Sequence, residues 1–235
     1  MKKLFSDVRQ LIGFQKTSMV DYPGRLASVI FFPFCNMRCP WCHNGALILN
    51  RQGGGTLIPL VEALYHAVKR RSVLGGIVLS GGEATLYSRL PELISRVKDL
   101  GLLVKLDTNG TRPDVLEKLI SSRETRPDYI AMDLKVAPRR YAELMAESKA
   151  EFKSESRSAG METLEFMEAE TAHLIERSAA IIRTSGIEHE FRSLNLPESY
   201  LTEEDKDAMR PLADGSLWSF RPLIRDNCLD PSWNE

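Results

Sequence analysis

Short apolar runs alternate with helical patterns along most of this 235-residue chain, and this alternation constrains the fold more than any other feature. Runs rich in β-branched and aromatic residues predict strands, and apolar residues three and four positions apart predict helices. The predicted strands are 27–32, 77–79, 102–106, 129–134, 187–194 and 218–220. The predicted helices lie at 57–68, 90–100 and 115–120, in parts of 139–182, and from 202 onward. About six strand–helix units imply an α/β fold with a parallel sheet, either a partial barrel or an open doubly wound sheet.

Length and composition fit a single domain over residues 1–235, with a core at about 20–225. The charged and serine-rich stretch inside 147–170 predicts an exposed insertion. A net charge of −1 gives no reason to expect nucleic acid or an acidic membrane as a partner. The chain begins without a long apolar run, and its longest apolar stretch, 27–34, is too short to span a bilayer. We therefore expect a cytoplasmic protein, whose four cysteines do not form structural disulfides.

Three of the cysteines, Cys35, Cys39 and Cys42, fall within eight positions directly after the first predicted strand. Three soft thiolates on one short loop suit either an Fe–S cluster or zinc. A structural zinc site would need a fourth ligand, which His43 or Cys228 could supply. In a cubane cluster, the three thiolates would leave one iron open for another ligand. The spacing alone leaves both readings open.

Polar or glycine-rich motifs also follow three of the later predicted strands: Ser80–Glu83, Asp107–Gly110 and Asp133–Lys135. The carboxyl ends of parallel strands meet at one edge of a sheet, where α/β enzymes place their active sites. A zinc knuckle does not explain this recurrence, whereas an active site built around the cysteine loop does.

The C-x3-C-x2-C loop with Trp41 before its third cysteine, followed by Gly81-Gly82-Glu83 after the next strand, resembles the radical S-adenosylmethionine (SAM) superfamily. The resemblance implies a partial (β/α)6 barrel and two cofactors, a [4Fe–4S] cluster and SAM. Three cysteines then bind three irons, and the amino and carboxylate groups of SAM chelate the fourth. One electron from the cluster cleaves SAM, and the resulting 5′-deoxyadenosyl radical abstracts a hydrogen atom. The chain departs from the family pattern at Phe34, where a glycine is usual, and at Ala84, where proline is usual.

A finer resemblance covers about 14–231 and is to the activating proteins of anaerobic ribonucleoside-triphosphate reductase. It rests on these segments: Val20–Arg25, Cys39–Asn44, Leu106–Gly110, Tyr129–Lys135, Glu190–Arg192 and Asn227–Pro231. The resemblance implies an oxidoreductase that abstracts a glycine Cα hydrogen from a glycyl-radical enzyme. It also implies a flavodoxin- or ferredoxin-type electron donor.

The resemblance further implies roles for residues outside the cysteine loop. Trp41 would pack beside the cluster and the adenine, although simple core packing fits it too. Gly81, Gly82 and Glu83 would meet the SAM amino group, or else form only a tight turn. The remaining implied SAM-binding residues are Asp107, Thr108, Asn109, Asp133, Lys135 and Arg192.

Those six residues also have simpler readings. Asp107, Thr108 and Asn109 could bind the ribose or methionine part of SAM, or could only cap a turn. Asp133 and Lys135 match the D-x-K motif of glycyl-radical activases near the cation and SAM sites, and could otherwise form a surface ion pair. Arg192 could pair with the SAM carboxylate, because its guanidinium offers a bidentate fork.

Two other functions stay open. One is a small-molecule radical SAM enzyme such as 7-carboxy-7-deazaguanine synthase, although Cys42-His43-Asn44 and Asp133-Leu134-Lys135 favour the activase. The other is a non-catalytic zinc or Fe–S binding module. Cys228 reads as a half-buried structural thiol.

Overall fold

The computed structural model describes residues 10–49, 56–145 and 161–234, and its strands form one eight-stranded sheet. The strands are β1 (Leu11–Ser18), β2 (Ala27–Phe32), β3 (Ile58–Pro59), β4 (Gly76–Gly81), β5 (Leu103–Thr108), β6 (Tyr129–Asp133), β7 (Glu188–Leu194) and β8 (Leu217–Arg221). Their order in the sheet is β3-β1-β2-β4-β5-β6-β7-β8. β2 and β4 to β8 pair in parallel, whereas β1 pairs antiparallel with both β2 and β3. Six parallel strands confirm the predicted α/β class with a parallel sheet.

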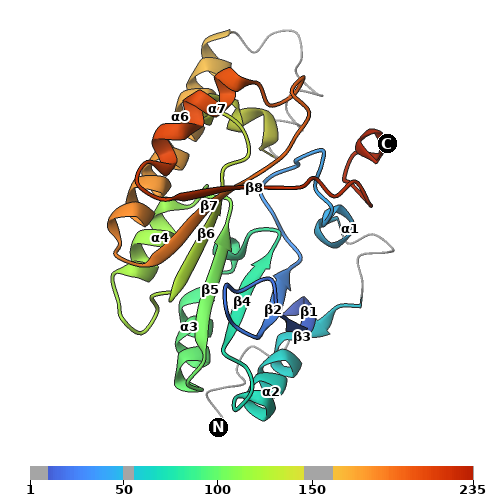
Figure 1. The fold of residues 1–235 in the computed structure, drawn as a ribbon, viewed down its shortest axis with the longest axis vertical. Coiled ribbons are helices and arrows are strands. Elements are labelled where there is room, and N and C mark those ends of the chain that lie inside the picture. The colour runs from blue at the N-terminus through green and yellow to red at the C-terminus, as the bar shows by residue number, and fades with distance from the viewer. Residues whose placement is uncertain (1–9, 50–55, 146–160, 235) are drawn as a thin grey trace.

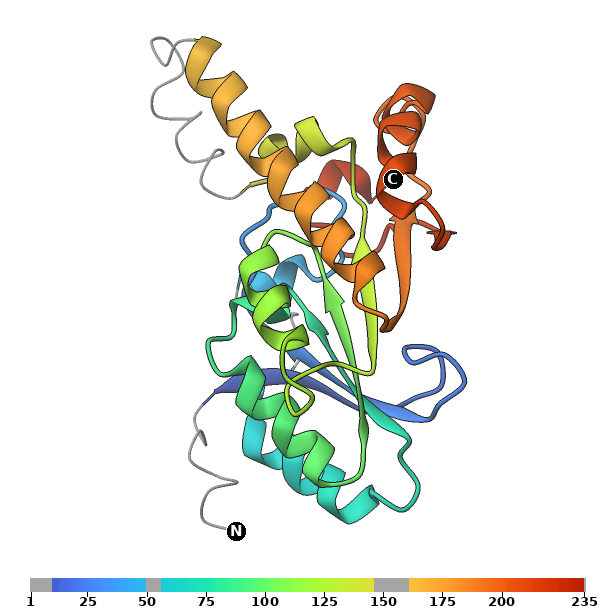
Figure 2. The same ribbon diagram turned by 90° about the vertical axis from the view of Figure 1, so that its left-hand side faces the viewer.

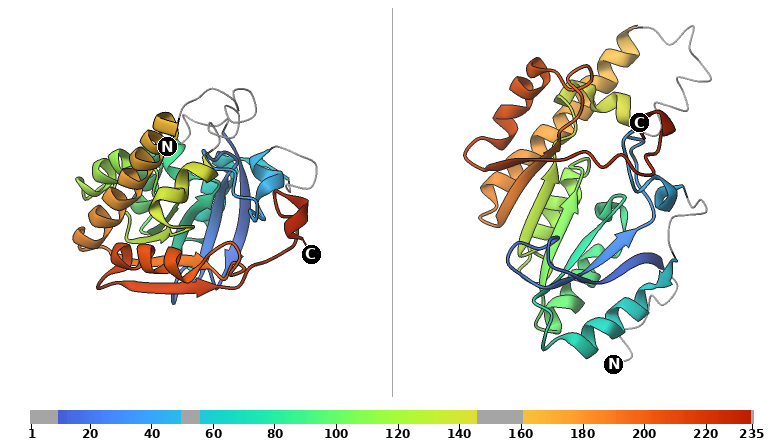
Figure 3. Two further views of the ribbon diagram at one scale, coloured as in Figure 1. Left: turned by 90° about the horizontal axis from the view of Figure 1, so that it is seen from above. Right: turned by 45° about the vertical axis from the view of Figure 1, so that its right-hand side comes forward.

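Helices connect the parallel strands. The helices are α1 (Gly45–Ile48), α2 (Leu60–Arg70), α3 (Leu90–Asp99), α4 (Pro113–Ile120), α6 (Met161–Thr184) and α7 (Glu203–Met209), and the 3-10 turns are η2 (Ala84–Leu86), η3 (Pro138–Leu144), η4 (Arg210–Ala213) and η5 (Pro231–Trp233). α2, α3, α4 and α6 lie on the same side of the sheet (Figures 1 and 2). Seen from above, the sheet is curved with its helices outside, as in a partial barrel (Figure 3).

Alternate side chains of the parallel strands enter two different cores, because successive residues of a strand point to opposite faces. The helix-facing core takes Ile30, Leu79, Leu106 and Met132, together with the apolar faces of the helices. The concave face carries a smaller cluster: Tyr22, Ala27, Val29, Val78, Tyr129 and Ala131. Two of these six are alanine, and the Lys105 ammonium lies 5.9 Å from the centroid of the Tyr129 ring, so this face also accommodates charged side chains.

Two strands and one α-helix of the described chain were not predicted from the sequence. β1 and β3 extend the sheet beyond β2, and α1 follows the cysteine loop. β1 gave a weak apolar pattern because three consecutive residues in its second half, Gln15 to Thr17, are exposed or nearly so. The predicted insertion falls largely on 147–160, which lies outside the described residues. Residues 161–170 form the beginning of α6, which extends past the end of the sheet (Figure 2).

The four cysteines all lie in the described ranges, and none of them takes part in a disulfide there. Within the described ranges, none of the helices combines the length and apolar character needed to cross a bilayer.

Candidate active site

The cysteine loop leaves the carboxyl end of β2 and is held from two sides. Cys39 is buried, and Cys35 and Cys42 are half-buried. On one side the Arg38 amide donates to the Leu144 carbonyl at 2.7 Å, next to a single bridge between Met37 and Met145. On the other side the Asp230 amide donates to the Pro40 carbonyl at 2.9 Å. Segments more than 100 residues away in the chain therefore fix the path of the loop.

Gly81 and Gly82 pack directly against this loop. A Cβ atom at Gly82 would lie 2.0 Å from the Phe34 carbonyl oxygen and 3.0 Å from the Cys35 Cβ. Gly81 has a φ of +110°, and a Cβ there would lie 2.3 Å from the Phe32 amide nitrogen. Only glycine fits at either position, so the double glycine lets the end of β4 approach Cys35 closely.

Glu83 is fully buried and joins two strand-end motifs. Its Oε1 accepts from the Thr85 amide (3.1 Å), the Thr85 hydroxyl (2.6 Å) and the Thr108 hydroxyl (2.9 Å). Its Oε2 accepts from the Asn109 amide at 2.6 Å. Burial raises the pKa of Glu83, and the hydrogen bonds from Thr85, Asn109 and Thr108 oppose that rise. The predicted contact of Glu83 with SAM stays a prediction, and in this structure the carboxylate holds the β4 and β5 ends together.

A chain of alternating charges crosses the ends of β5, β7 and β6. The Lys105 ammonium pairs with Asp107, and Arg192 Nη1 lies 3.6 Å from the Asp107 carboxylate. Arg192 also contacts Asp133 through Nε at 3.0 Å and Nη2 at 2.9 Å, and Lys135 Nζ lies 3.3 Å from the same carboxylate. Three cations and two carboxylates alternate, so these five side chains together carry a net charge of +1.

The Lys135 end of this charge chain faces the cysteines. Burial alone would lower the pKa of Lys135, but Asp133, Cys39, Tyr141 and Cys42 together raise it. Lys135 in turn lowers the pKa values of Cys35 and Cys42. One ammonium group thus lies within electrostatic range of all three thiols.

Burial dominates the acidity of the thiols themselves. It raises the pKa of Cys35 to about 11 and also raises the pKa of Cys42. Such thiols are unreactive as free groups, but coordination by a metal deprotonates a thiol outright. Three soft donors on one loop, one buried and two half-buried, with a cation beside them, fit the predicted [4Fe–4S] cluster. Among the described side chains, no group of three His, Cys, Asp or Glu residues is positioned to hold a single metal ion.

An aromatic cluster covers the outer side of the loop. Trp41 is buried, with ring centroids 5.0 Å from Tyr200 and 5.3 Å from Trp233, and these last two lie 5.2 Å apart. Trp233 belongs to the C-terminal segment that runs back beside α1 (Figures 1 and 3). In that segment Cys228 is buried, and its amide donates to Asn234 Oδ1 at 2.8 Å. The core-packing reading of Trp41 therefore holds, and its contact with a cofactor stays a prediction.

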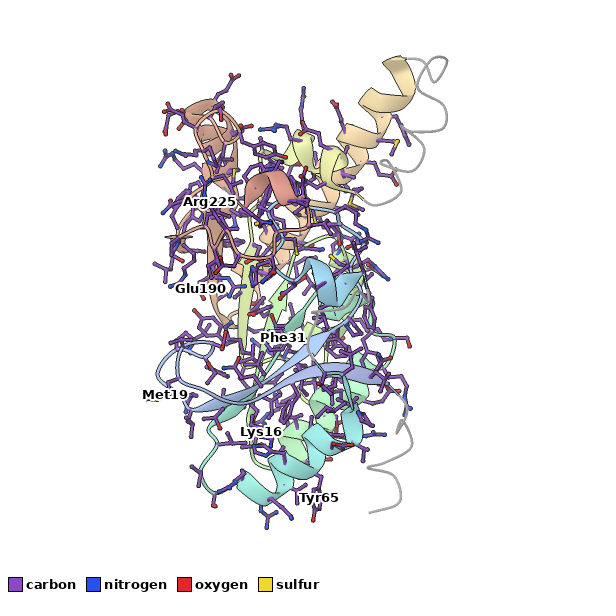
Figure 4. All side chains as sticks on the ribbon, turned by 90° about the vertical axis from the view of Figure 1, so that its right-hand side faces the viewer. Lys16, Met19, Phe31, Tyr65, Glu190 and Arg225 are labelled. Carbon is purple, nitrogen blue, oxygen red and sulfur yellow. The ribbon has the colours of Figure 1, made fainter. Side chains whose placement is uncertain are left out.

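A cavity of about 350 Å³ opens beside the loop, between β1 and α1. Its lining includes Phe31, His43 and Asn44. Figure 4 shows Phe31 at mid-height in the molecule, between Met19 in the β1–β2 loop and Arg225 in the segment after β8. Burial and the nearby Lys135 lower the pKa of His43.

All thirteen predicted site residues lie in the cysteine loop or at the carboxyl ends of β4 to β7, as the strand order requires. Sequence reasoning missed several of their partners: Asn36, Ser80, Lys105, Thr111, Tyr141, Tyr200 and Trp233. Lys105 carried a usable signal, because it lies two positions before Asp107 and so shares its strand face.

The comparisons with known proteins agree with this geometry. A family model described as the Radical SAM superfamily matches residues 29–155. A protein of Methanocaldococcus jannaschii, whose name provisionally assigns it to the glycyl-radical enzyme activating enzymes, is 38% identical over 146 residues, which cover 62% of this chain and 55% of that protein. The pyruvate formate-lyase 1-activating enzyme of Escherichia coli K12 is 30% identical over 138 residues, which cover 55% of this chain and 53% of that protein. This chain therefore spans about half the length of the curated relatives it matches.

Solved structures share the fold. TYW1 with a lysine–pyruvate adduct bound superposes with a TM-score of 0.53 at 15% identity, covering 84% of this chain and 65% of that one. Native anSMEcpe with bound AdoMet gives a TM-score of 0.51 at 17% identity, covering 82% of this chain and 50% of that one. Members of the matched superfamily use a [4Fe–4S] cluster and SAM. The strand order, the three-cysteine loop and a family match over more than half of the sequence establish that this chain belongs to the radical SAM superfamily.

Proposed function

We propose that this chain cleaves SAM reductively at a [4Fe–4S] cluster and removes a Cα hydrogen from a glycine of a glycyl-radical enzyme. The observation that carries the proposal is the cysteine loop at the carboxyl end of β2, ringed by the polar ends of the next four strands. The names of the relatives from M. jannaschii and E. coli support the glycyl-radical class of partner.

In this proposal Cys35, Cys39 and Cys42 hold the cluster. When bound, the cluster supplies one electron and SAM supplies the group that takes up the hydrogen atom. The packing of Trp41 against Tyr200 and Trp233 covers one side of the loop and limits the access of water to it from that side. The positive charge of Lys135 offsets part of their negative charge.

The charge chain is the proposed seat of the methionine part of SAM. The methionine part carries both an ammonium and a carboxylate group. The row of charged side chains places both carboxylates and cations at one edge of the sheet. Asp107 and Asp133 are the available acceptors, and Lys135 and Arg192 the available donors. Arg192 already contacts both carboxylates, so a bound carboxylate would share its guanidinium with Asp107 and Asp133.

For the partner we propose the anaerobic ribonucleoside-triphosphate reductase, and for the source of the electron that reduces the cluster of this chain a flavodoxin- or ferredoxin-type donor. Motif resemblance from Val20–Arg25 to Asn227–Pro231 supports this choice. The last of these motifs lies beside the cysteine loop, since Asp230 bonds to Pro40.

The test combines the anaerobically reconstituted chain with SAM, a reductant and a purified anaerobic ribonucleotide reductase. We expect a SAM-dependent glycyl-radical doublet on the reductase in the EPR spectrum, and we expect Cys39→Ala to abolish it. SAM cleavage without that signal on any glycyl-radical protein would contradict the activase proposal and favour a small-molecule substrate. A protein that holds one zinc ion and leaves SAM intact would contradict the enzyme proposal itself.

A further inference from the structure

Asn36, Asn109 and Thr111 form a closed ring of hydrogen bonds between the cysteine loop and the end of β5. Asn36 Nδ2 donates to Thr111 Oγ1 at 2.9 Å, and the Thr111 hydroxyl donates to Asn109 Oδ1 at 2.6 Å. Asn109 Nδ2 closes the ring by donating to Asn36 Oδ1 at 3.0 Å. Each member of the ring both donates and accepts, so the ring has a single consistent direction.

The orientation of the Asn109 amide is fixed by a group that can only donate. The Thr111 backbone amide lies 3.0 Å from one end of the Asn109 side chain. A backbone N–H cannot accept a hydrogen bond, so that end must be the carbonyl oxygen Oδ1. The NH2 group of Asn109 therefore faces the cysteine loop.

The second proton of that NH2 group is directed at a cysteine. Asn109 Nδ2 lies 3.9 Å from Cys35 Sγ, within the range of a hydrogen bond to sulfur. Asn109 is only 3% exposed. Both protons and the oxygen of its side-chain amide are hydrogen-bonded, to Asn36, Thr111 and Cys35. The side chain has no hydrogen-bonding capacity left for SAM in this arrangement.

The backbone of Asn109 is anchored as firmly as its side chain. Its amide donates to Glu83 Oε2 at 2.6 Å, and the Glu83 amide donates to the carbonyl of Phe34, the residue before Cys35, at 2.8 Å. Glu83 thus ties Asn109, through its carboxylate, to the backbone that carries the cysteine, through its own amide.

We infer that Asn109, oriented by Asn36 and Thr111, is a positioning residue whose N–H···S hydrogen bond to Cys35 sets the reduction potential of the cluster. The inference rests on the proposed function, because it requires Cys35 to be a cluster ligand. Reduction adds negative charge to a cluster and its thiolate sulfurs, so an N–H donor stabilises the reduced form more than the oxidised form. Hydrogen bonds to sulfur are one of the established determinants of cluster potentials.

The expected result of removing this donor is a lower potential. In Asn109→Ala we expect the ratio of reduced to oxidised cluster at a fixed potential to fall by up to about tenfold, which is about 59 mV for a one-electron couple. Thr111→Val, which removes the hydroxyl that holds Asn109, should lower the potential by a smaller amount. Thr111→Ser keeps the hydroxyl and should leave the potential at the wild-type value.

The experiment is an EPR-monitored redox titration of the reconstituted full chain and its variants. Asn44→Ala is the matched control, because the Asn44 side chain lies beside the loop and donates to the Gly81 carbonyl at 3.2 Å rather than to sulfur. A lower potential in Asn109→Ala, with Asn44→Ala unchanged, supports the inference. A wild-type potential in Asn109→Ala, or an equal fall in Asn44→Ala, overturns it.

If Asn109→Ala does not bind a cluster, the comparison of Thr111→Val with Thr111→Ser tests the inference instead. A lower potential in Thr111→Val than in Thr111→Ser supports the inference, and equal potentials overturn it. Failure of the proposed function is seen separately, because the wild-type chain would then bind no cluster or leave SAM uncleaved. A wild-type chain that binds a cluster and cleaves SAM, with the same potential in the wild type and in the Asn109 and Thr111 variants, refutes only the role of Asn109.

Discussion

The contact between Gly82 and the cysteine loop allows a quantitative prediction for Gly82→Ala. The added Cβ would lie 2.0 Å from the Phe34 carbonyl oxygen and 2.6 Å from its carbonyl carbon. Both are backbone atoms, so no side-chain rotation relieves the clash. Reaching even 3.0 Å, the shortest separation real Cβ atoms adopt, requires the loop to move by about 1 Å.

We expect this change to cost the upper end of the range for overpacking, about 3 kcal/mol of unfolding free energy. Gly101→Ala is the matched control, since Gly101 has a φ of +78° and no heavy atom within 4 Å of its would-be Cβ. Its cost comes from backbone strain alone and should be about 1 kcal/mol. Because the Gly82 Cβ would also press on Cys35, only Gly82→Ala should lose bound iron.

The assay is urea unfolding of the metal-free variants, followed by iron and sulfide analysis after anaerobic reconstitution. We expect Gly82→Ala to be less stable than Gly101→Ala by about 2 kcal/mol and to hold less iron. A Gly82→Ala protein as stable as Gly101→Ala, with a full complement of iron, would refute the claim that this glycine sets the approach of β4 to Cys35.

Three further predictions concern the same site. Glu83→Gln should lower the unfolding free energy by about 2 kcal/mol, because each carboxylate oxygen accepts from a backbone N–H and the new NH2 group would face one of these two donors. The exposed Glu92→Gln should change the unfolding free energy little. Equal urea midpoints for the two variants would contradict the prediction. Trp233→Ala should cost about 2 kcal/mol through its two lost aromatic contacts and hasten the bleaching of the cluster in air, whereas Trp233→Phe should do neither. In the metal-free protein, iodoacetamide labelling of Cys35 should rise about tenfold per pH unit up to pH 10, because burial raises its pKa to about 11, and a plateau near pH 9 would argue against that burial.

The parallel part of the fold could be predicted because its central strands, β2, β4, β5 and β6, are buried along most of their length. Such strands read as continuous β-branched or aromatic runs, and polar motifs mark where several of them end. β1 was not predicted because only part of it is buried, so its apolar pattern is weak. Its antiparallel pairing with β2 is a tertiary contact, which the local sequence pattern does not indicate. The C-terminal segment escaped for a similar reason, since its place beside the loop depends on the bond between Asp230 and Pro40.

At the site, the residue types were predictable and their partners were not. Cysteine spacing and strand-end motifs located Cys35 and Asn109 at one sheet edge, but the direction of an amide side chain depends on its neighbours in space. Lys105 illustrates the limit: a lysine within a strand is ordinarily read as solvent-facing, and here it is 1% exposed and paired with Asp107. The sequence was sufficient to predict which residues lie at the carboxyl ends of the strands. Their hydrogen-bond and ion-pair partners could be identified only from the three-dimensional structure.

The central claim is that the three-cysteine loop supports reductive cleavage of SAM, and the most direct measurement is 5′-deoxyadenosine formation by the anaerobically reconstituted, reduced protein. The account predicts product with the wild-type chain and none with single alanine variants of Cys35, Cys39 or Cys42 whose far-ultraviolet circular dichroism matches wild type. Product that persists in any of these three variants, or a wild-type protein that holds four irons and four sulfides yet leaves SAM intact, would contradict it.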